Sequence, residues 1–189
     1  MKLKISFNSP VILIFTIICV IVLGLDLITN GITNIYLFST YNSPITDPLA
    51  YIRIITHIFG HASWEHFLGN ITLILIVGPL LEEKYGSKEL VGVILVTALI
   101  TGLVNNIFFP DIRLLGASGV AFSLILLSSF TSIKNGEIPM TFILVALIYI
   151  LGELTNAIAV NDNVSNITHI IGGATGAVLG FFLKPITSL

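Results

Sequence analysis

Six apolar runs, each close to the length that crosses a lipid bilayer, constrain this chain more than any other feature of its sequence. They fall at about residues 11–28, 67–82, 90–107, 117–132, 139–156 and 167–183. About 20 apolar residues form a helix long enough to span a hydrocarbon core of roughly 30 Å. Charged residues make up only 10% of the chain, well below the share of roughly a quarter that is usual in soluble domains. The sequence therefore predicts an all-α membrane protein with a bundle of six transmembrane helices.

The segments between these runs predict a single domain and a defined orientation in the membrane. None of them is long enough to hold a soluble domain, so we expect one transmembrane domain over residues 1–189. In a six-crossing topology the six lysines fall on the side of the N-terminus, whereas Arg53 and Arg113 fall on the other side. Because basic residues are enriched on the cytoplasmic side, we expect both termini in the cytoplasm. The formal net charge of −2 argues against nucleic acid as a partner.

A serine between small residues opens the fourth run, in the sequence Gly116-Ala117-Ser118-Gly119. The second, fourth and sixth runs all begin on the outer side of the membrane. This topology brings Ser118 to the same depth as His66, Asn70 and His169. The fourth run spans only about 24 Å at 1.5 Å per residue, which is less than the hydrocarbon core. We therefore expect its start to lie below the outer surface, in a cavity that water can reach.

The residue types that converge there suit nucleophilic catalysis. Serine becomes an effective nucleophile when an adjacent base takes its proton, and the pKa of imidazole suits that role near neutral pH. We therefore predict Ser118 as the nucleophile and His169 as its base. His66 and Asn70 lie four residues apart on one helix face, so both side chains can donate to an oxyanion. No acidic residue follows His169 at a suitable spacing, so we expect a dyad, and we expect no cofactor.

Glycines beside these residues predict close approach of the helices. Gly116 and Gly119 flank the serine and leave room for another helix and for a substrate backbone. Gly172 and Gly176 recur at a spacing of four on the sixth run, so they share one helix face. A small-residue face of this kind allows two membrane helices to pack closely. We expect that contact to bring His169 within reach of the fourth helix.

Each of these residues also has a structural interpretation. Taken alone, Ser118 is more often a packing or capping residue than a nucleophile, and His169 can cap a loop. His57, His61 and His66 can be interpreted as a metal site, because histidine is a common zinc ligand. The chain has no His-Glu-x-x-His motif, so we expect no metal and interpret His57 and His61 as residues that order a loop. A transporter is a further alternative, although repeated halves are not visible in the sequence.

Three separated motifs carry a resemblance to a known family. They are His57-x₃-His61-x₄-His66-x₃-Asn70, Gly116-Ala117-Ser118-Gly119 and His169-x₂-Gly172-x₃-Gly176. In this order, over about residues 53–180, they resemble the rhomboid intramembrane serine proteases. The resemblance implies a dyad of Ser118 and His169. It also implies an oxyanion hole formed by His66, Asn70 and the backbone N–H of the serine.

The same resemblance implies a setting and a substrate class. We expect a minimal six-helix rhomboid-like bundle whose first loop is half inserted in the outer leaflet of the bilayer. The substrates are expected to be single-pass membrane proteins, cut within or near the bilayer. We expect a multi-pass protein of a prokaryotic cell membrane, with the lipid bilayer as its environment.

Two positions depart from the family pattern. The Trp-Arg pair of the first loop is Ile52-Arg53 here, so only the arginine is kept. A tyrosine often follows the serine by one helical turn and packs on the catalytic imidazole, but this chain has Phe122, which can stack and cannot hydrogen-bond. An inactive rhomboid-like protein that binds helices remains the alternative. Such proteins lose the serine or the histidine, and this chain retains both.

Overall fold

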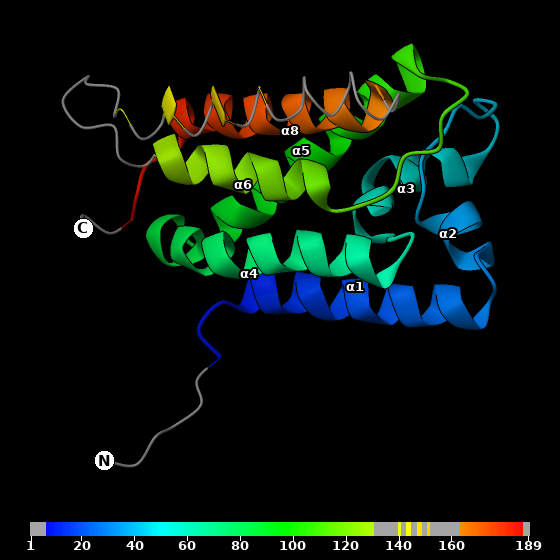
Figure 1. Cartoon of the computed structure of the whole chain (residues 1–189), viewed down its shortest axis with the longest axis horizontal. Coiled ribbons are helices and arrows are strands. Elements are labelled where there is room, and N and C mark those ends of the chain that lie inside the picture. The colour runs from blue at the N-terminus through cyan, green and yellow to red at the C-terminus, as the bar shows by residue number, and fades with distance from the viewer. Residues whose placement is uncertain are drawn as a thin grey trace.

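The computed structural model describes residues 7–130, 140, 143–144, 147–148, 151 and 163–186, and these residues form a helical bundle (Figure 1). The long helices are α1 (Pro10–Ile28), α4 (Trp64–Tyr85), α5 (Ser87–Phe108), α6 (Ser118–Phe130) and α8 (Asn163–Phe182). Shorter helices connect α1 to α4, namely α2 (Ile32–Leu37), α3 (Pro48–Thr56) and the 3-10 helix η1 (His57–Phe59). No strand occurs within these described ranges, and the prediction of an all-α fold is confirmed.

The observed helices coincide with the predicted apolar runs. Three of them, α1, α4 and α5, are long and apolar enough to cross a membrane. The apolar stretches Ser118–Ser129 and Ile167–Phe182, in α6 and α8, are shorter. Most of the predicted fifth run, 139–156, lies outside the described residues. In α1, large apolar side chains such as Ile14, Ile17 and Ile21 are half exposed, as expected for a helix face in contact with lipid chains.

A buried carboxylate fixes the start of α1 against α4. The helix begins with Pro10, whose fixed φ and missing N–H suit a first helical position. The backbone N–H groups of Val11 and Ile12 donate to the two carboxylate oxygens of Glu82, at 3.0 and 3.1 Å. The hydroxyl of Ser87 donates to the same carboxylate at 2.7 Å. A buried acid from α4 therefore satisfies N–H groups that α1 cannot satisfy itself, and holds these two helices in register.

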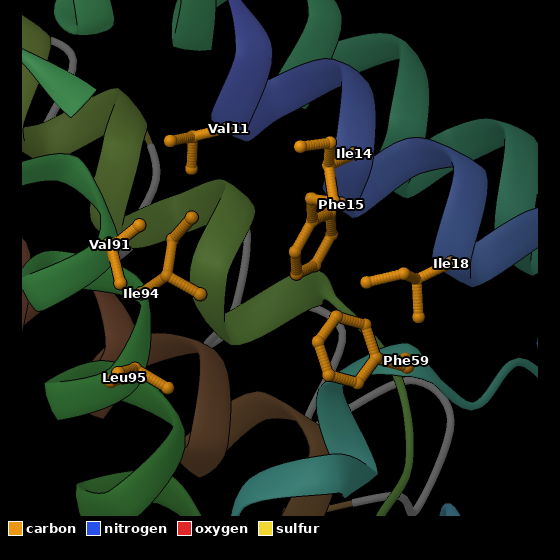
Figure 2. Close-up of a pocket in the computed structure, with 8 residues that line it drawn as sticks. All are labelled: Val11, Ile14, Phe15, Ile18, Phe59, Val91, Ile94 and Leu95. Atoms are coloured by element: carbon orange, nitrogen blue, oxygen red, sulfur yellow. The ribbon is translucent and has the colours of Figure 1, made fainter. Parts of the chain in front are cut away.

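An apolar groove lies along one side of the bundle, between α1, α5 and the end of η1 (Figure 2). Its volume is about 210 Å³. The residues that line it are all apolar: Val11, Ile14, Phe15, Ile18, Phe59, Val91, Ile94 and Leu95. Because none of these side chains can donate or accept a hydrogen bond, the groove suits hydrocarbon and offers nothing for acid–base chemistry. The polar side chains that could support catalysis lie elsewhere, at the start of α6.

Candidate active site

The loop that leads into Ser118 is held by hydrogen bonds from three directions. Leu114 pairs with Thr40 of the first connector through two backbone hydrogen bonds of 2.8 and 2.9 Å. The side-chain amide of Asn105, at the end of α5, donates to the carbonyl of Ile112 at 3.0 Å. The N–H of Gly116 donates to the carbonyl of His57 at 3.0 Å. The segment just before the serine is therefore fixed to the loop that carries the histidines.

The helix α6 begins at Ser118, as the sequence predicted. In Figure 1 this start is set back from the end of the bundle at which α2 and α3 lie. The first backbone N–H groups of a helix have no partner within the helix, so they point at whatever occupies the space before it. Ser118 thus stands at a recessed helix start, where the first backbone N–H groups of α6 point out of the N-terminal end of the helix.

Two predicted oxyanion donors of α4 meet the segment before the serine. A Cβ atom at Gly116 would lie 2.7 Å from both Cε1 and Nε2 of His66, and 3.7 Å from the side-chain nitrogen of Asn70. Both side chains therefore approach the backbone two residues before Ser118. Gly116 has a φ of 127°, which residues with a side chain rarely adopt. From the sequence, this glycine was expected to leave room for another helix or a substrate, and in the structure its open side is taken by His66.

The glycines of α8 lie directly on the backbone of α6. A Cβ at Gly172 would stand 2.7 Å from the Cα of Gly119, and one at Gly176 would stand 2.7 Å from the Cα of Ser123. Ordinary contacts of a Cβ atom begin near 3.4 Å, so only glycine fits at either position without a shift. This close packing is the contact expected from the spacing of the glycines, and it sets the position of α8 relative to the serine helix.

His169 of α8 meets the serine helix α6 at Phe122, one helical turn after Ser118. The ring of His169 packs on the ring of Phe122, with centroids 4.9 Å apart and planes inclined by 44°. Phe122 follows Ser118 by four residues, so the two side chains share one face of α6. His169 also interacts electrostatically with His66. The structure therefore places His169 against Phe122 and near His66, and the Phe122 ring packs on the imidazole at a tilted angle.

His57 is a buried structural residue that joins η1 to α5. Its Nδ1 lies 3.0 Å from the carbonyl oxygen of Ile54, and its Nε2 lies 3.3 Å from the hydroxyl of Thr101. In a neutral ring Nδ1–H donates to the carbonyl, and Nε2 is left as an acceptor for the hydroxyl. Burial lowers the pKa of His57 to about 4, which keeps the ring neutral at physiological pH.

His61 occupies a similar place, between the loop and the start of α4. Its Nδ1 lies 3.1 Å from the carbonyl oxygen of Phe59. Its ring meets the ring of His66 edge-on, with centroids 5.2 Å apart. Burial, together with the charge of His66, lowers the pKa of His61 to about 4. Among the described residues, no group of three His, Cys, Asp or Glu side chains is placed to hold a metal ion. His57 and His61 instead use their rings in separate hydrogen bonds within the fold.

Arg53 anchors the first connector, although isoleucine rather than tryptophan precedes it. Its guanidinium is buried, with 2% of the side chain exposed, and pairs with Asp47 at 2.6 Å. It also donates to the hydroxyl of Ser43 at 2.8 Å and packs 4.5 Å over the ring of Tyr41. The hydrogen bond from Arg53 holds the pKa of Asp47 below its ordinary value. Ile52 is about half exposed, and the arginine makes these contacts without a tryptophan beside it.

Several polar residues that shape the site were not singled out from the sequence. Thr97, Thr101 and Asn105 are all buried on one face of α5. The hydroxyl of Thr97 donates to that of Ser123 in α6 at 3.0 Å, which adds a polar contact to the serine helix. Their spacing of four within an apolar run is the signal that could have revealed them, because polar residues in a membrane helix face the protein interior.

A comparison with models of protein families shows to which family this chain belongs. The model of the Rhomboid domain matches residues 48–186, which include every element that carries the candidate site. The chain belongs to the rhomboid family. Its helices and family together make it an integral membrane protein. The rhomboid family includes serine proteases, and one relative of the chain is named a rhomboid protease.

Individual relatives of this rhomboid are distant in sequence. Rhomboid protease GlpG from Haemophilus influenzae is 26% identical over 96% of this chain and 94% of its own length. Rhomboid-related protein 1 from Caenorhabditis elegans is 28% identical over 68% of this chain, but the match spans only 39% of that protein. Rhomboid-like protein 11 of Arabidopsis thaliana chloroplasts is 27% identical over 84% of this chain and 59% of its own length. The chain thus matches part of the longer relatives and nearly the whole of the bacterial one.

Proposed function

We propose that this rhomboid is an intramembrane serine endopeptidase in which Ser118 is the nucleophile and His169 the general base. The observation that carries the proposal is the packing of the His169 ring on Phe122, one helical turn after Ser118. Further support comes from the glycine contacts between α6 and α8, which leave little freedom in how these two residues face each other. The proposed catalytic unit comprises residues 1–189 as a single transmembrane domain.

The proposed reaction is acyl transfer in two steps. The Oγ of Ser118 attacks the carbonyl carbon of the scissile peptide bond, and His169 takes the hydroxyl proton. When the tetrahedral intermediate collapses, the C–N bond breaks and the imidazolium gives its proton to the leaving amine. A water molecule, deprotonated by His169, then attacks the ester carbonyl. The ester C–O bond breaks, the acid product leaves, and the imidazolium returns its proton to the Oγ of Ser118. Phe122 packs beside the imidazole and holds the plane of its ring.

Negative charge on the substrate oxygen is stabilised by donors at the start of α6. We propose the side chains of His66 and Asn70 and the backbone N–H of Ser118 for this role. Their approach to the Gly116 loop supports it, since a Cβ at Gly116 would touch His66. The side-chain nitrogen of Asn70 is buried and makes no hydrogen bond within the described residues, so it is available to a substrate oxygen. Removing one donor of this kind typically lowers the rate by roughly 10²–10³.

The proposed substrates are single-pass membrane proteins, which reach the recessed serine from within the bilayer. A peptide bond in a membrane helix is shielded by its own hydrogen bonds, so the segment that is cut must unwind near Ser118. The excess of lysine on one side supports a topology with cytoplasmic termini and a site near the outer surface of a prokaryotic cell membrane.

The proposal is tested by cleavage of a single-pass substrate in proteoliposomes. We expect wild-type protein to cut it, and Ser118→Ala and His169→Ala each to lower kcat by a factor of at least about 10⁴. Ser129→Ala is the matched control in the same helix, because its hydroxyl bonds to the carbonyl of Ile125 within its own helix. A metal chelator should leave cleavage unchanged. Full activity in Ser118→Ala would refute the assignment of the nucleophile. Binding of the substrate by the wild type without cleavage would favour the helix-binding alternative.

A further inference from the structure

An acid at the outer end of α1 makes a two-point contact with α2. Asp26 lies in the last turn of α1, where the helix dipole disfavours a negative charge. One of its carboxylate oxygens accepts the backbone N–H of Asn34 at 2.7 Å, and the other accepts the side-chain amide of Asn34 at 2.7 Å. The chain reverses between them at Asn30 and Gly31, which both have positive φ. Sequence alone gave this pair no role.

Asn34 in turn reaches the loop that carries the histidines. Its side-chain amide has a second hydrogen, which is donated to the carbonyl of His61 at 3.0 Å. The residue is buried, with 7% exposed. Gly60 permits this approach, because a Cβ there would lie 2.9 Å from the Asn34 amide oxygen. One asparagine therefore ties the end of α1 to the residue that precedes α4 by three positions.

The contact continues from His61 to the proposed oxyanion histidine. The His61 ring is fully buried and meets the His66 ring edge-on at 5.2 Å. His66 then stands against Gly116, whose Cβ position lies 2.7 Å from its Nε2. Close packing and hydrogen bonds thus connect Asp26 and Asn34 to His66 without any contact to the substrate.

We propose that Asp26 and Asn34 are positioning residues that set the placement of the His66 imidazole through the backbone and ring of His61. This inference rests on the proposed function, in which His66 stabilises the oxyanion. The hydrogen bond from Asn34 fixes the His61 carbonyl, and the buried His61 ring limits the orientation that His66 can take. Since a misplacement of about 1 Å can lower a rate by roughly 10²-fold, a small rotation of His66 is enough to reduce kcat.

A variant in which Asp26 and Asn34 are exchanged distinguishes an effect on the placement of His66 from an effect on the stability of the fold. In the double variant Asp26→Asn with Asn34→Asp, the amide of residue 26 can donate to the carboxylate of residue 34 and its oxygen can accept the N–H of residue 34. All contacts between α1 and α2 are therefore kept, but the donor to the His61 carbonyl is lost. We expect the unfolding temperature to return close to that of wild type while kcat stays lower by about tenfold, with KM little changed. Recovery of kcat together with stability would overturn the proposal.

If the exchanged protein is unstable, a double-mutant cycle with His66 tests whether Asn34 acts on kcat through His66. We expect Asn34→Ala to lower kcat by about tenfold in the wild-type background and to have no further effect in His66→Ala. Thr33→Ala is the control in α2, because its hydroxyl bonds to Thr29 and leaves the Asn34 contacts intact. An equal loss from Asn34→Ala in both backgrounds would show that the residue acts elsewhere.

A spectroscopic measurement separates this inference from the proposed function. In protein labelled with ¹⁵N-histidine, the ring signals of His66 should shift in Asn34→Asp and stay in place in Thr33→Ala. That readout needs no cleavage. A wild type that cuts no substrate would refute the proposed function and leave this test standing, whereas unchanged His66 signals in an active enzyme would refute the positioning role alone.

Discussion

Gly172→Ala perturbs the contact that places the proposed base. A Cβ at this position would lie 2.7 Å from the Cα of Gly119, about 0.7 Å short of ordinary contact. The carbonyl oxygen of Gly119 would lie nearer still. Because these obstacles are backbone rather than a flexible side chain, α8 must move away from α6 by at least that distance. His169 lies one turn earlier on α8, so it moves with the helix. A displacement of 1 Å at a catalytic group can cost roughly 10²-fold, so we expect kcat to fall by about 30- to 100-fold.

The same substitution should have a smaller effect on stability. Overpacking costs typically about 1–3 kcal/mol, and the higher helix propensity of alanine offsets up to about 1 kcal/mol of this. The assay is kcat on a single-pass substrate in proteoliposomes, together with the free energy of unfolding in detergent. Gly92→Ala in α5 is the matched control, since nothing lies within 4 Å of a Cβ there. Unchanged kcat in Gly172→Ala would refute the claim that this contact positions His169.

Three further predictions concern the imidazole contact, the start of α1 and the buried histidines. Phe122→Ala should lower kcat between about twofold and tenfold, because an aromatic contact of this kind contributes about 0.5–1.5 kcal/mol. Glu82→Gln should lower the free energy of unfolding by about 2 kcal/mol and leave kcat unchanged, because it weakens charge-assisted bonds to the N-terminus of α1. Stability should fall as the pH drops from 6.5 to about 4. In that range His57 and His61 bind protons in the unfolded chain but stay neutral in the folded protein. Proton binding therefore favours the unfolded state and lowers the free energy of unfolding by roughly 3 kcal/mol for each histidine.

Controls for these three predictions come from the same contacts. Phe122→Tyr keeps the ring on His169 and should keep most of the activity, so equal losses in Phe122→Ala and Phe122→Tyr would contradict a packing role. For Glu82, a loss of kcat without a loss of stability would be the contrary result. The unfolding midpoint in detergent is measured across the pH range, and His57→Asn should flatten the curve. A wild-type stability that is flat between pH 6.5 and 4 would show that these rings are not held neutral.

Hydrophobic pattern was sufficient to predict the bundle. Transmembrane helices satisfy their own backbone hydrogen bonds, so a run of about 20 apolar residues has few alternatives to a helix. This explains why α1, α4 and α5 match the predicted runs closely, and why the start of α6 at Ser118 could be predicted from the sequence. The spacing of Gly172 and Gly176 likewise predicted a close contact, because helical periodicity puts both on one face.

The connections between the helices could not be predicted in the same way. The backbone pairing of Thr40 with Leu114 joins residues far apart in the chain, and no periodicity encodes such a contact. In the sequence, Glu82 is a charged residue near the end of a predicted helix. Its role as a cap for the N-terminus of α1 is visible only in the structure, where it accepts a hydrogen bond from the backbone of α1. The pairing of Asp26 with Asn34 could not be predicted either, since polar residues at a helix end or in a short connecting helix normally need no explanation. The assignment of Ser118 and His169 as a catalytic pair stays a prediction that chemistry must test.

Covalent labelling tests the central claim most directly. A fluorophosphonate reacts with a serine whose hydroxyl is activated by a neighbouring base, and leaves a stable adduct on that oxygen. We expect mass spectrometry of the treated protein to locate one adduct on Ser118, and we expect labelling to be lost in His169→Ala and retained in Ser129→Ala. An adduct on another residue, or labelling of Ser118 that is as fast in His169→Ala as in wild type, would contradict the account.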